Sequence, residues 1–409
     1  MRDKESQHYF GLDIGTSTVR CVVGMIDPTD STQLSIIGHG SAPNLGMRKG
    51  SVVHVDDVSE AIAVAVTEAE RVSGIHIKSA TVNVNGSHVA GIDSRGTIAI
   101  SAANREIDEN DRLRVEEAAT IVQLPPNREI IQVFAKNYRV DGQDNIKDPV
   151  GMHGIRLEVD THIVAASSPN LRNLELALDK ARVHPSHKAV SSLASVESVL
   201  KRQQKESGTL ILDIGSGTTN ICVVEDGEVQ HVAVLPVGGM NITNDLAIGL
   251  KTDLDIAEKV KINSASLSDD RSSGSVLVEH DGKKHYFDAS DVHMITEERV
   301  AELLEYVDKE LKKIKKSRKL PGGVVLVGGT ANLPGIADFT KEKLQLASRI
   351  GVLNSMNGLV DAVSGPEYTT AVGLMMLDML LLPSTENTRS SGNNIVRGLL
   401  DGLFGKNKR

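Results

Sequence analysis

One short motif occurs twice in this chain, and the repeat limits the possible folds more than any other feature. The first copy begins at Asp13 and reads Asp-Ile-Gly-Thr-Ser-Thr-Val-Arg-Cys-Val-Val; the second begins at Asp213 and contains one extra residue. Each copy follows a short apolar run and leads into a second run that ends near a turn, which is the pattern of a β-hairpin. Because 409 residues are enough for two or more domains, the two hairpins predict two related domains that face each other.

The residues of these two turns are suited to holding phosphate groups. Glycine lets the backbone approach a ligand, successive N–H groups there can form a nest for an anion, and hydroxyl side chains add donors. The candidate phosphate-binding residues are Gly15, Thr16, Ser17, Gly215, Ser216, Gly217, Thr218 and Thr219. Asp13 and Asp213 come directly before the turns, where carboxylates can hold a hydrated Mg²⁺ and orient an attacking water. They are the candidate catalytic and metal residues.

A third glycine motif follows an apolar run near the end of the chain. Residues 324–327 read Val-Val-Leu-Val, and Gly328, Gly329 and Thr330 come next. The pattern predicts a buried strand that ends in a Gly-Gly turn, which can pass under a flat base or ribose. A single Asp-Ile-Gly turn is most simply an ordinary hairpin, and many α/β proteins have a strand ending in Gly-Gly. The combination of the three motifs indicates a nucleotide site.

These motifs resemble those of a known superfamily, the actin and sugar-kinase ATPases. Residues 10–20 are similar to its first phosphate motif, residues 210–221 to its second, and residues 324–336 to its adenosine motif. Residues 367–374, Glu-Tyr-Thr-Thr-Ala-Val-Gly-Leu, resemble the start of the helix that follows in bacterial actins. The resemblance implies an α/β, actin-like two-domain ATPase fold that binds ATP and Mg²⁺ in a cleft.

Within this superfamily, the resemblance to the FtsA family of bacterial cell-division proteins extends over nearly the whole chain. The segment that begins at Gly238 and Gly239 is similar to the one after the second hairpin in FtsA. Residues 257–261, Ala-Glu-Lys-Val-Lys, resemble a helix whose Glu and Lys approach the nucleotide's sugar and base. Glu258 and Lys261 share one helical face and are assigned to the cofactor site on this resemblance. Without it they would most simply be a solvated charge pair.

Two positions depart from the usual FtsA pattern. The family usually has Lys where Thr18 stands and Asp where Asn220 stands. Arg20 lies two residues after Thr18, on the same face of the strand. Since Arg also binds phosphate oxygens, it is a candidate replacement for the missing Lys. Both Asp-Ile-Gly turns are intact, so nucleotide binding remains the prediction.

The resemblance also divides the chain into subdomains. An amphipathic helix is expected at 56–73, and a small subdomain called 1C in FtsA is expected between the halves of the first domain. Within 1C the pattern predicts a helix at 108–122 and strands at 96–101, 129–140 and 154–166. The predicted units are 1–85 and 164–195 (domain 1A), 86–163 (inserted 1C), 196–244 and 320–383 (domain 2A), 245–319 (subdomain 2B), 384–392 (flexible linker) and 393–409 (amphipathic helix).

The last stretch of the chain has the pattern of a membrane-surface anchor. Its apolar residues form one helical stripe, and its polar residues are mainly basic. The stripe consists of Ile395, Val396, Leu399, Leu400, Leu403 and Phe404. A tethered basic helix of this kind suits anionic lipid, and the alternative is a helix that docks on the protein itself or on a partner. The apolar segment 371–382 is too short to span a bilayer and contains Asp378, so it is predicted to be a buried helix.

The composition argues against a nucleic-acid-binding protein, because the formal net charge is −9. Cys21 and Cys222 are the only cysteines and lie in apolar runs, so they are expected to be reduced core residues of a cytosolic protein.

The FtsA resemblance implies a function as a polymerising ATP-binding protein, at most a slow ATPase. It would tether the FtsZ division ring to the cytoplasmic face of the cell membrane at the division site. The implied partners are the FtsZ C-terminal peptide on the small lobe of domain 2, other copies of the chain, later division proteins at 1C, and anionic lipid. The alternative is a PilM-like pilus assembly protein, a family that lacks the amphipathic tail. A sugar or acetate kinase is disfavoured, because it would need groups for a second substrate and the sequence offers no obvious candidates. A chaperone-like ATPase is disfavoured, because it would need a peptide-binding domain.

Overall fold

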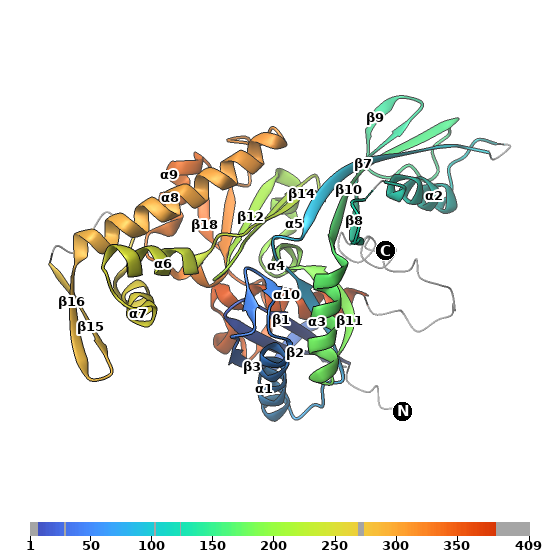
Figure 1. Ribbon diagram of the computed structural model, residues 1–409. Coiled ribbons are helices and arrows are strands. Elements are labelled where there is room, and N and C mark those ends of the chain that lie inside the picture. Colours follow the sequence, from blue (N-terminus) through green and yellow to red (C-terminus); the bar gives the residue numbers. More distant parts are fainter. Residues whose placement is uncertain (1–6, 28–29, 102–103, 123, 269–273, 382–409) are drawn as a thin grey trace.

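The computed structural model describes residues 7–27, 30–101, 104–122, 124–268 and 274–381, and they form two lobes with a small insert (Figure 1). The first lobe contains a mixed sheet of six strands in the order β11-β6-β1-β2-β3-β19. Its strands are β1 (His8–Ile14), β2 (Thr18–Asp27), β3 (Asp30–Pro43), β6 (Ser79–Val84), β11 (His184–Val190) and β19 (Asn357–Gly358). The short strands β4 (Met47–Arg48) and β5 (Ser51–Val52) pair in the loop that follows β3.

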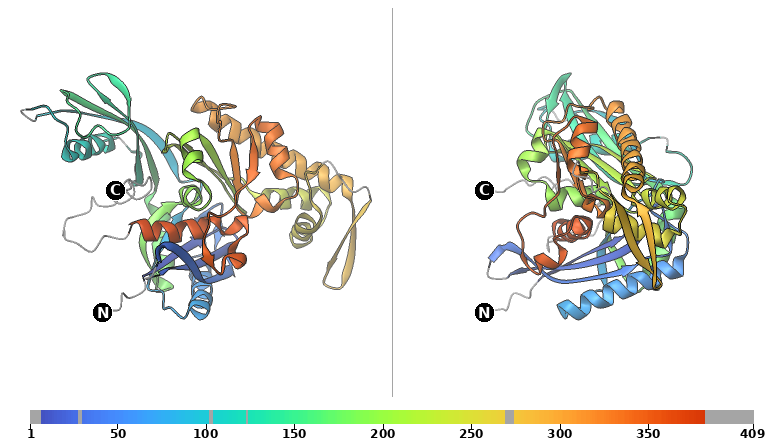
Figure 2. Two further views of the ribbon diagram at one scale, coloured as in Figure 1. Left: turned by 180° about the vertical axis from the view of Figure 1, so that it is seen from behind. Right: turned by 90° about the vertical axis from the view of Figure 1, so that its left-hand side faces the viewer.

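Helix α1 (Val55–Ser73) covers one face of this sheet, as the apolar periodicity predicts (Figure 2). Its apolar stripe, including Val58, Ile62 and Ala69, is buried. The helix ends where Gly74 takes a left-handed conformation (φ 72°), which glycine adopts at little cost. Helix α3 (Ser168–Lys180) packs beside α1.

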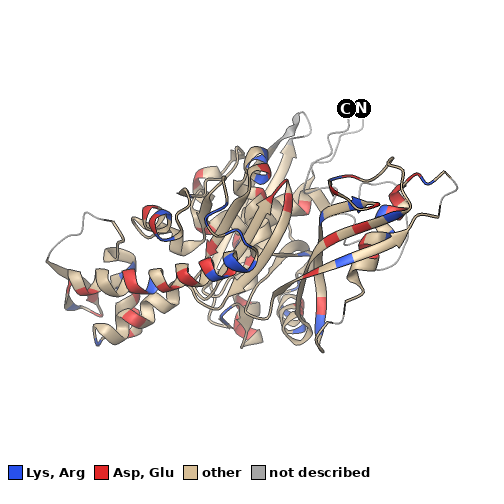
Figure 3. Ribbon diagram, turned by 90° about the horizontal axis from the view of Figure 1, so that it is seen from above, with Lys and Arg blue, Asp and Glu red and all other residues tan. Residues whose placement is uncertain are grey.

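The second lobe contains a five-stranded sheet in the order β14-β13-β12-β17-β18. Its strands are β12 (Thr209–Ile214), β13 (Thr219–Glu225), β14 (Glu228–Leu235), β17 (Val324–Val327) and β18 (Ser348–Ile350). The helices of this lobe are α5 (Arg202–Ser207), α6 (Gly239–Gly249), α7 (Leu254–Ser264), α8 (Ala289–Lys313) and α9 (Ile336–Leu344). Helix α8 carries charges of both signs along its length (Figure 3). The hairpin of β15 (Ser275–His280) and β16 (Lys283–Asp288), which the sequence pattern did not predict, lies at the far end of this lobe (Figure 1).

The insert forms its own four-stranded sheet at the opposite end of the molecule (Figure 1). Its elements are β7 (Ala90–Ala99), α2 (Glu109–Thr120), β8 (Arg128–Val140), β9 (Gln143–Ile146) and β10 (Arg156–Ser167), with strand order β7-β10-β8-β9. The helix and the strands β8 and β10 occur where the sequence predicts them, whereas β7 begins six residues before the strand predicted at 96–101. Strand β9 was not predicted, because it is mostly polar and exposed and lacks an alternating pattern.

Cys21 and Cys222 are free and buried, as expected. Helices α4 (Ser191–Val199) and α10 (Thr369–Leu381) pack against each other between the lobes (Figure 2). Residues 320–383 are predicted to belong to the second lobe, but the last part of this range lies in the first lobe. Strand β19 pairs with β3 there, and α10 packs on β1 because the apolar side chains of α10 share the core of the first lobe.

The tail lies outside the described residues, so the linker at 384–392 and the amphipathic helix at 393–409 stay predictions. Among the residues that are described, no helix combines the length and the apolar character needed to cross a membrane.

The insert also contacts the second lobe, along the outer edge of β14. The Val232 N–H donates to Nε2 of His162 (3.0 Å), whose Nδ1 lies 2.7 Å from Asp93. At Gly91 a side chain would meet the Val232 carbonyl oxygen at 2.6 Å, so the two backbones are in direct contact. The insert is therefore attached through the first lobe but also rests on a strand of the second.

Glu228, at the start of β14, is expected to make stability at this junction depend on pH. Its Oε2 atom is buried without a hydrogen-bond partner among the described residues. Burial, with the nearby Glu116 and Glu206 carboxylates, raises the pKa of Glu228 to about 8, although Lys147 opposes the shift. Since the folded state then holds this proton more tightly than the unfolded state, stability falls as pH rises from about 4.5 to about 8.

In the Glu228→Gln variant the side chain at this position has no charge at any pH. The variant should therefore be more stable than the unaltered chain at pH 8.5 by about 1 kcal/mol. At pH 4 the two proteins should differ little. Thermal unfolding at both pH values measures this, with the exposed Glu279→Gln as control. A Glu228→Gln protein that is less stable at pH 8.5 would contradict the assignment.

Candidate nucleotide-binding cleft

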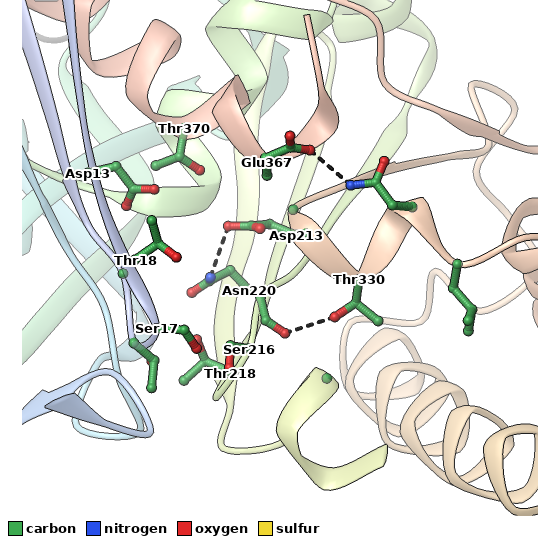
Figure 4. A pocket seen from close by; sticks show the side chains of 18 of the residues that line it. Asp13, Ser17, Thr18, Asp213, Ser216, Thr218, Asn220, Thr330, Glu367 and Thr370 are labelled. Atoms are coloured by element: carbon green, nitrogen blue, oxygen red, sulfur yellow. Dashed lines mark hydrogen bonds between the residues drawn. The ribbon is translucent and has the colours of Figure 1, made fainter. Parts of the chain in front are cut away.

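A cavity of about 430 Å³ lies between the two lobes and is lined by residues from both (Figure 4). It contains both Asp-Ile-Gly turns, the Gly-Gly turn after β17, and side chains from α7 and the start of α10. The predicted site residues that line it are Asp13, Gly15, Thr16, Ser17, Arg20, Asp213, Gly215, Ser216, Thr218, Gly239, Glu258, Lys261, Gly328, Gly329 and Thr330. The structure thus brings three motifs that are far apart in the sequence to one place.

Three predicted residues do not line this cavity: Gly217, Thr219 and Gly238. Thr219 is fully buried, and its hydroxyl donates to the Val237 carbonyl oxygen (2.8 Å). A Cβ on Gly238 would lie 2.6 Å from the Gly215 carbonyl oxygen, and one on Gly217 would lie 2.9 Å from Thr16. These two glycines therefore allow two segments of the protein to approach each other; they do not make room for a ligand.

The two hairpins close in the same way. The Gly15 N–H donates to the Thr18 carbonyl oxygen (3.1 Å), and the Gly215 N–H donates to the Thr218 carbonyl oxygen (2.9 Å). A Cβ at Gly15 would lie only 2.7 Å from that same Thr18 oxygen, so this turn requires glycine. The sequence repeat is thus a repeat of backbone geometry.

The two carboxylates of the repeat are buried on the cleft wall. Asp13 accepts a hydrogen bond from Asn83 Nδ2 (2.7 Å), and Asp213 accepts one from Asn220 Nδ2 (3.1 Å). Burial raises the pKa of Asp13 to about 7; Arg20 opposes this shift and Asp213 adds to it. Burial likewise raises the pKa of Asp213 to about 6, against hydrogen bonds from Asn220 and Thr370 and the charge of Arg20. A cation placed between these groups would favour their ionised forms.

The donor set fits a hydrated Mg²⁺ better than a metal held by protein alone. Among the described residues, no group of three His, Cys, Asp or Glu side chains could hold a metal. Mg²⁺ usually keeps several waters and uses one or two carboxylates together with substrate phosphates. Asp13 and Asp213 supply the carboxylates, and the Oδ1 atom of Asn220 is buried, lacks a partner within the described part of the chain, and could accept from a bound water.

Arg20 provides a cation on the same wall of the cleft. It pairs with Asp13 across β1 and β2, and its guanidinium lies 5.2 Å from the centre of the Tyr368 ring. The equivalent position in the second hairpin is Asn220, which pairs with Asp213. One hairpin therefore has a cation opposite its aspartate, whereas the other has an amide.

The other end of the cleft combines one ion pair with apolar side chains. Lys261 Nζ lies 2.6 Å from Glu258 and donates to the Thr243 hydroxyl (2.9 Å), which itself donates to Glu258. Apolar side chains beside this cluster could cover the face of a base. They are Ile242, Ile262, Leu333 and Pro334. A polar end for phosphates and a partly apolar end for a base match the two parts of a nucleotide.

Several cleft residues were not assigned from the sequence. Asn85, Ser191, Glu367 and Thr370 line the cavity, and Glu367 accepts from Asn332 (2.9 Å). The segment containing Glu367 and Thr370 was singled out only as a helix start. Asn85 follows a buried strand and precedes a glycine, and this position at the end of a strand is the sequence signal that could have identified it as a site residue.

Solved structures with a similar arrangement are found among actin-like proteins. A chain of the PilM-PilN type IV pilus biogenesis complex is 17% identical with a TM-score of 0.65, covering 90% of this chain and 98% of that one. MreB5 of Spiroplasma citri bound to ADP is 12% identical with a TM-score of 0.52, covering 90% and 94%. At these identities the likeness concerns the fold alone. Together with the two-hairpin cleft, it places this protein in the class with an actin-like ATPase fold.

Sequence comparison narrows the class to one family. The family model described as "Cell division protein FtsA" matches residues 210–373, and "SHS2 domain inserted in FTSA" matches residues 86–165. FtsA of Pseudomonas aeruginosa is 35% identical over 90% of this chain and 88% of its own; FtsA of Bacillus subtilis is 36% identical over 95% and 86%. The chain belongs to the FtsA family of cell-division proteins.

Proposed function

We propose that this protein binds ATP with Mg²⁺ in the cleft between its lobes and uses the nucleotide to control assembly. The observation that carries this proposal is the convergence of both Asp-Ile-Gly hairpins on one cavity that also contains the Gly-Gly turn. The hairpin N–H groups and the Thr16, Ser17, Ser216 and Thr218 hydroxyls would hold phosphates. Asp13 and Asp213 would hold hydrated Mg²⁺ and orient the attacking water of a slow hydrolysis.

The Gly328–Thr330 turn, Glu258 and Lys261 would hold the ribose and base. Arg20 would supply the positive charge that family members usually take from a lysine, since it faces Asp13 in the cleft. A neighbour with this fold bound to ADP, MreB5 of Spiroplasma citri, supports the assignment of the cleft to an adenine nucleotide.

The assembled form would tether the FtsZ division ring to the cytoplasmic face of the cell membrane and recruit later division proteins. Membership of the FtsA family supports the role in division. A solved structure with this fold is a double helical filament of MamK, which supports polymerisation. The FtsZ C-terminal peptide would dock on residues 245–319, later division proteins on the insert, and residues 393–409 on anionic lipid. A single short helix binds lipid reversibly, so several copies in one filament would hold more firmly.

Electron microscopy of lipid monolayers with ATP tests this proposal. The full chain is expected to form filaments on anionic lipid, whereas a chain that ends at Pro383 is expected to leave the lipid bare. Equal lipid binding by both chains would contradict the anchor and favour a PilM-like role. Lipid binding by the full chain without filaments would contradict polymerisation.

A further inference from the structure

Asn85 connects the inserted subdomain to the second phosphate hairpin. It follows β6 and is the last residue before the insert, yet it lines the cleft. Its Oδ1 atom accepts from the Gly86 N–H (2.6 Å), so the orientation of the side-chain amide is fixed. The Nδ2 atom therefore faces the Thr218 hydroxyl and donates to it (3.1 Å).

This hydrogen bond determines what the Thr218 hydroxyl can do. A hydroxyl group has one hydrogen to donate and accepts through its lone pairs. Because Thr218 accepts from Asn85, its own hydrogen points away from Asn85. Figure 4 places Thr218 beside Ser17 and Ser216, where the two hairpins meet. The hydroxyl is thus oriented as a donor at the end of the cleft that is suited to phosphate.

The first hairpin has a matching contact. The Gly50 N–H donates to the Thr16 hydroxyl (3.1 Å), so that hydroxyl also accepts from a neighbouring loop. The two loops touch, since a Cβ on Gly50 would lie 2.6 Å from Gly86 Cα. Gly50 and Gly86 both have positive φ angles, 75° and 120°, which favour glycine. One pair of contacting loops thus orients a hydroxyl on each hairpin.

We propose that Asn85 is a positioning residue for a bound polyphosphate, so that the start of the insert forms part of the nucleotide site. It acts through Thr218: with Asn85 in place, the Thr218 hydroxyl donates to a phosphate oxygen without first having to reorient. This inference rests on the proposed function, because it requires that nucleotide phosphates occupy the cleft. The rival explanation is that Asn85 only fastens the second hairpin to the first lobe.

Substitution of Asn85, with ATP and adenosine as probes, separates these explanations. Asn85→Ala is expected to weaken ATP binding about 3- to 10-fold, the usual effect of losing one hydrogen bond between neutral groups. Adenosine has no phosphate, so its affinity should not change. Asn85→Asp should weaken ATP binding more, because a carboxylate accepts the Thr218 hydrogen and repels phosphate. Asn137→Ala, on β8 of the insert, is the matched control and should bind ATP normally.

A double substitution gives the readout that a fastening role would not produce. Thr218→Val removes the hydroxyl at similar volume, so Asn85→Ala should cause no further loss of ATP affinity in that background. An equal loss with and without Thr218→Val would overturn the proposal, as would an equal loss for ATP and adenosine. Equal ATP affinity of Asn85→Ala and the unaltered chain would overturn this inference alone. Failure of the unaltered chain to bind ATP would overturn the proposed function and the inference with it.

Discussion

Replacing Gly217 with valine is expected to lower the affinity for ATP at least about 100-fold, close to 2.7 kcal/mol. A Cβ at this position would lie 2.9 Å from both Oγ1 and Cγ2 of Thr16, and 3.2 Å from its Cβ. Thr16 cannot easily turn away, because its hydroxyl accepts from the Gly50 N–H. The valine methyl groups would therefore push the two hairpins apart, and a ligand gripped from both sides would lose contacts on at least one. Calorimetric titration with ATP measures the loss.

The same geometry provides the controls. Thr218→Ala removes a single donor to phosphate and should weaken ATP binding only about 10-fold. Adding Thr16→Ala to Gly217→Val removes the atoms that the valine meets first, so part of the lost affinity should return. The melting temperature should show that each variant is folded. ATP affinity equal to that of the unaltered chain in Gly217→Val would count against a nucleotide held between the hairpins.

The parts of the fold that were predictable are those determined by local pattern. The Asp13 and Asp213 turns have the same residue types and close with the same backbone hydrogen bond, so their equivalence could be inferred from the sequence. Helix α1 followed from its apolar stripe, and the Gly328–Gly329 turn followed from the apolar run before it. These elements position most of the cleft.

The parts that were missed depend on contacts between distant segments. The sequence pattern at Gly217 suits a ligand or a neighbouring side chain equally well, and only the position of Thr16 distinguishes them. Asn85 is recognisable as part of the site only once β6 is seen to end beside Thr218, 133 residues away. Strand β19 pairs with β3 although most of the second lobe lies between them in sequence. Periodicity carries no information about such pairings.

Replacing Asp378 with alanine is expected to destabilise the protein by about 3–5 kcal/mol. In the sequence, this residue was an argument against a membrane span. In the structure, its carboxylate is 4% exposed and accepts from the Phe10 N–H (3.0 Å) and from the Thr81 and Ser186 hydroxyls (2.7 Å each). The donors lie on β1, β6 and β11. Alanine would leave these three donors without this acceptor, among them the fully buried Thr81 hydroxyl, and urea denaturation measures the cost.

The nature of the contact, and not burial alone, should determine the size of this effect. Asp378→Asn keeps the shape and one acceptor oxygen, but its NH₂ group would face at least one donor, so an intermediate loss of about 1–3 kcal/mol is expected. The exposed Asp361→Ala should change stability by less than about 0.5 kcal/mol. If Asp378→Ala were as stable as Asp361→Ala, the carboxylate would not be joining α10 to the sheet.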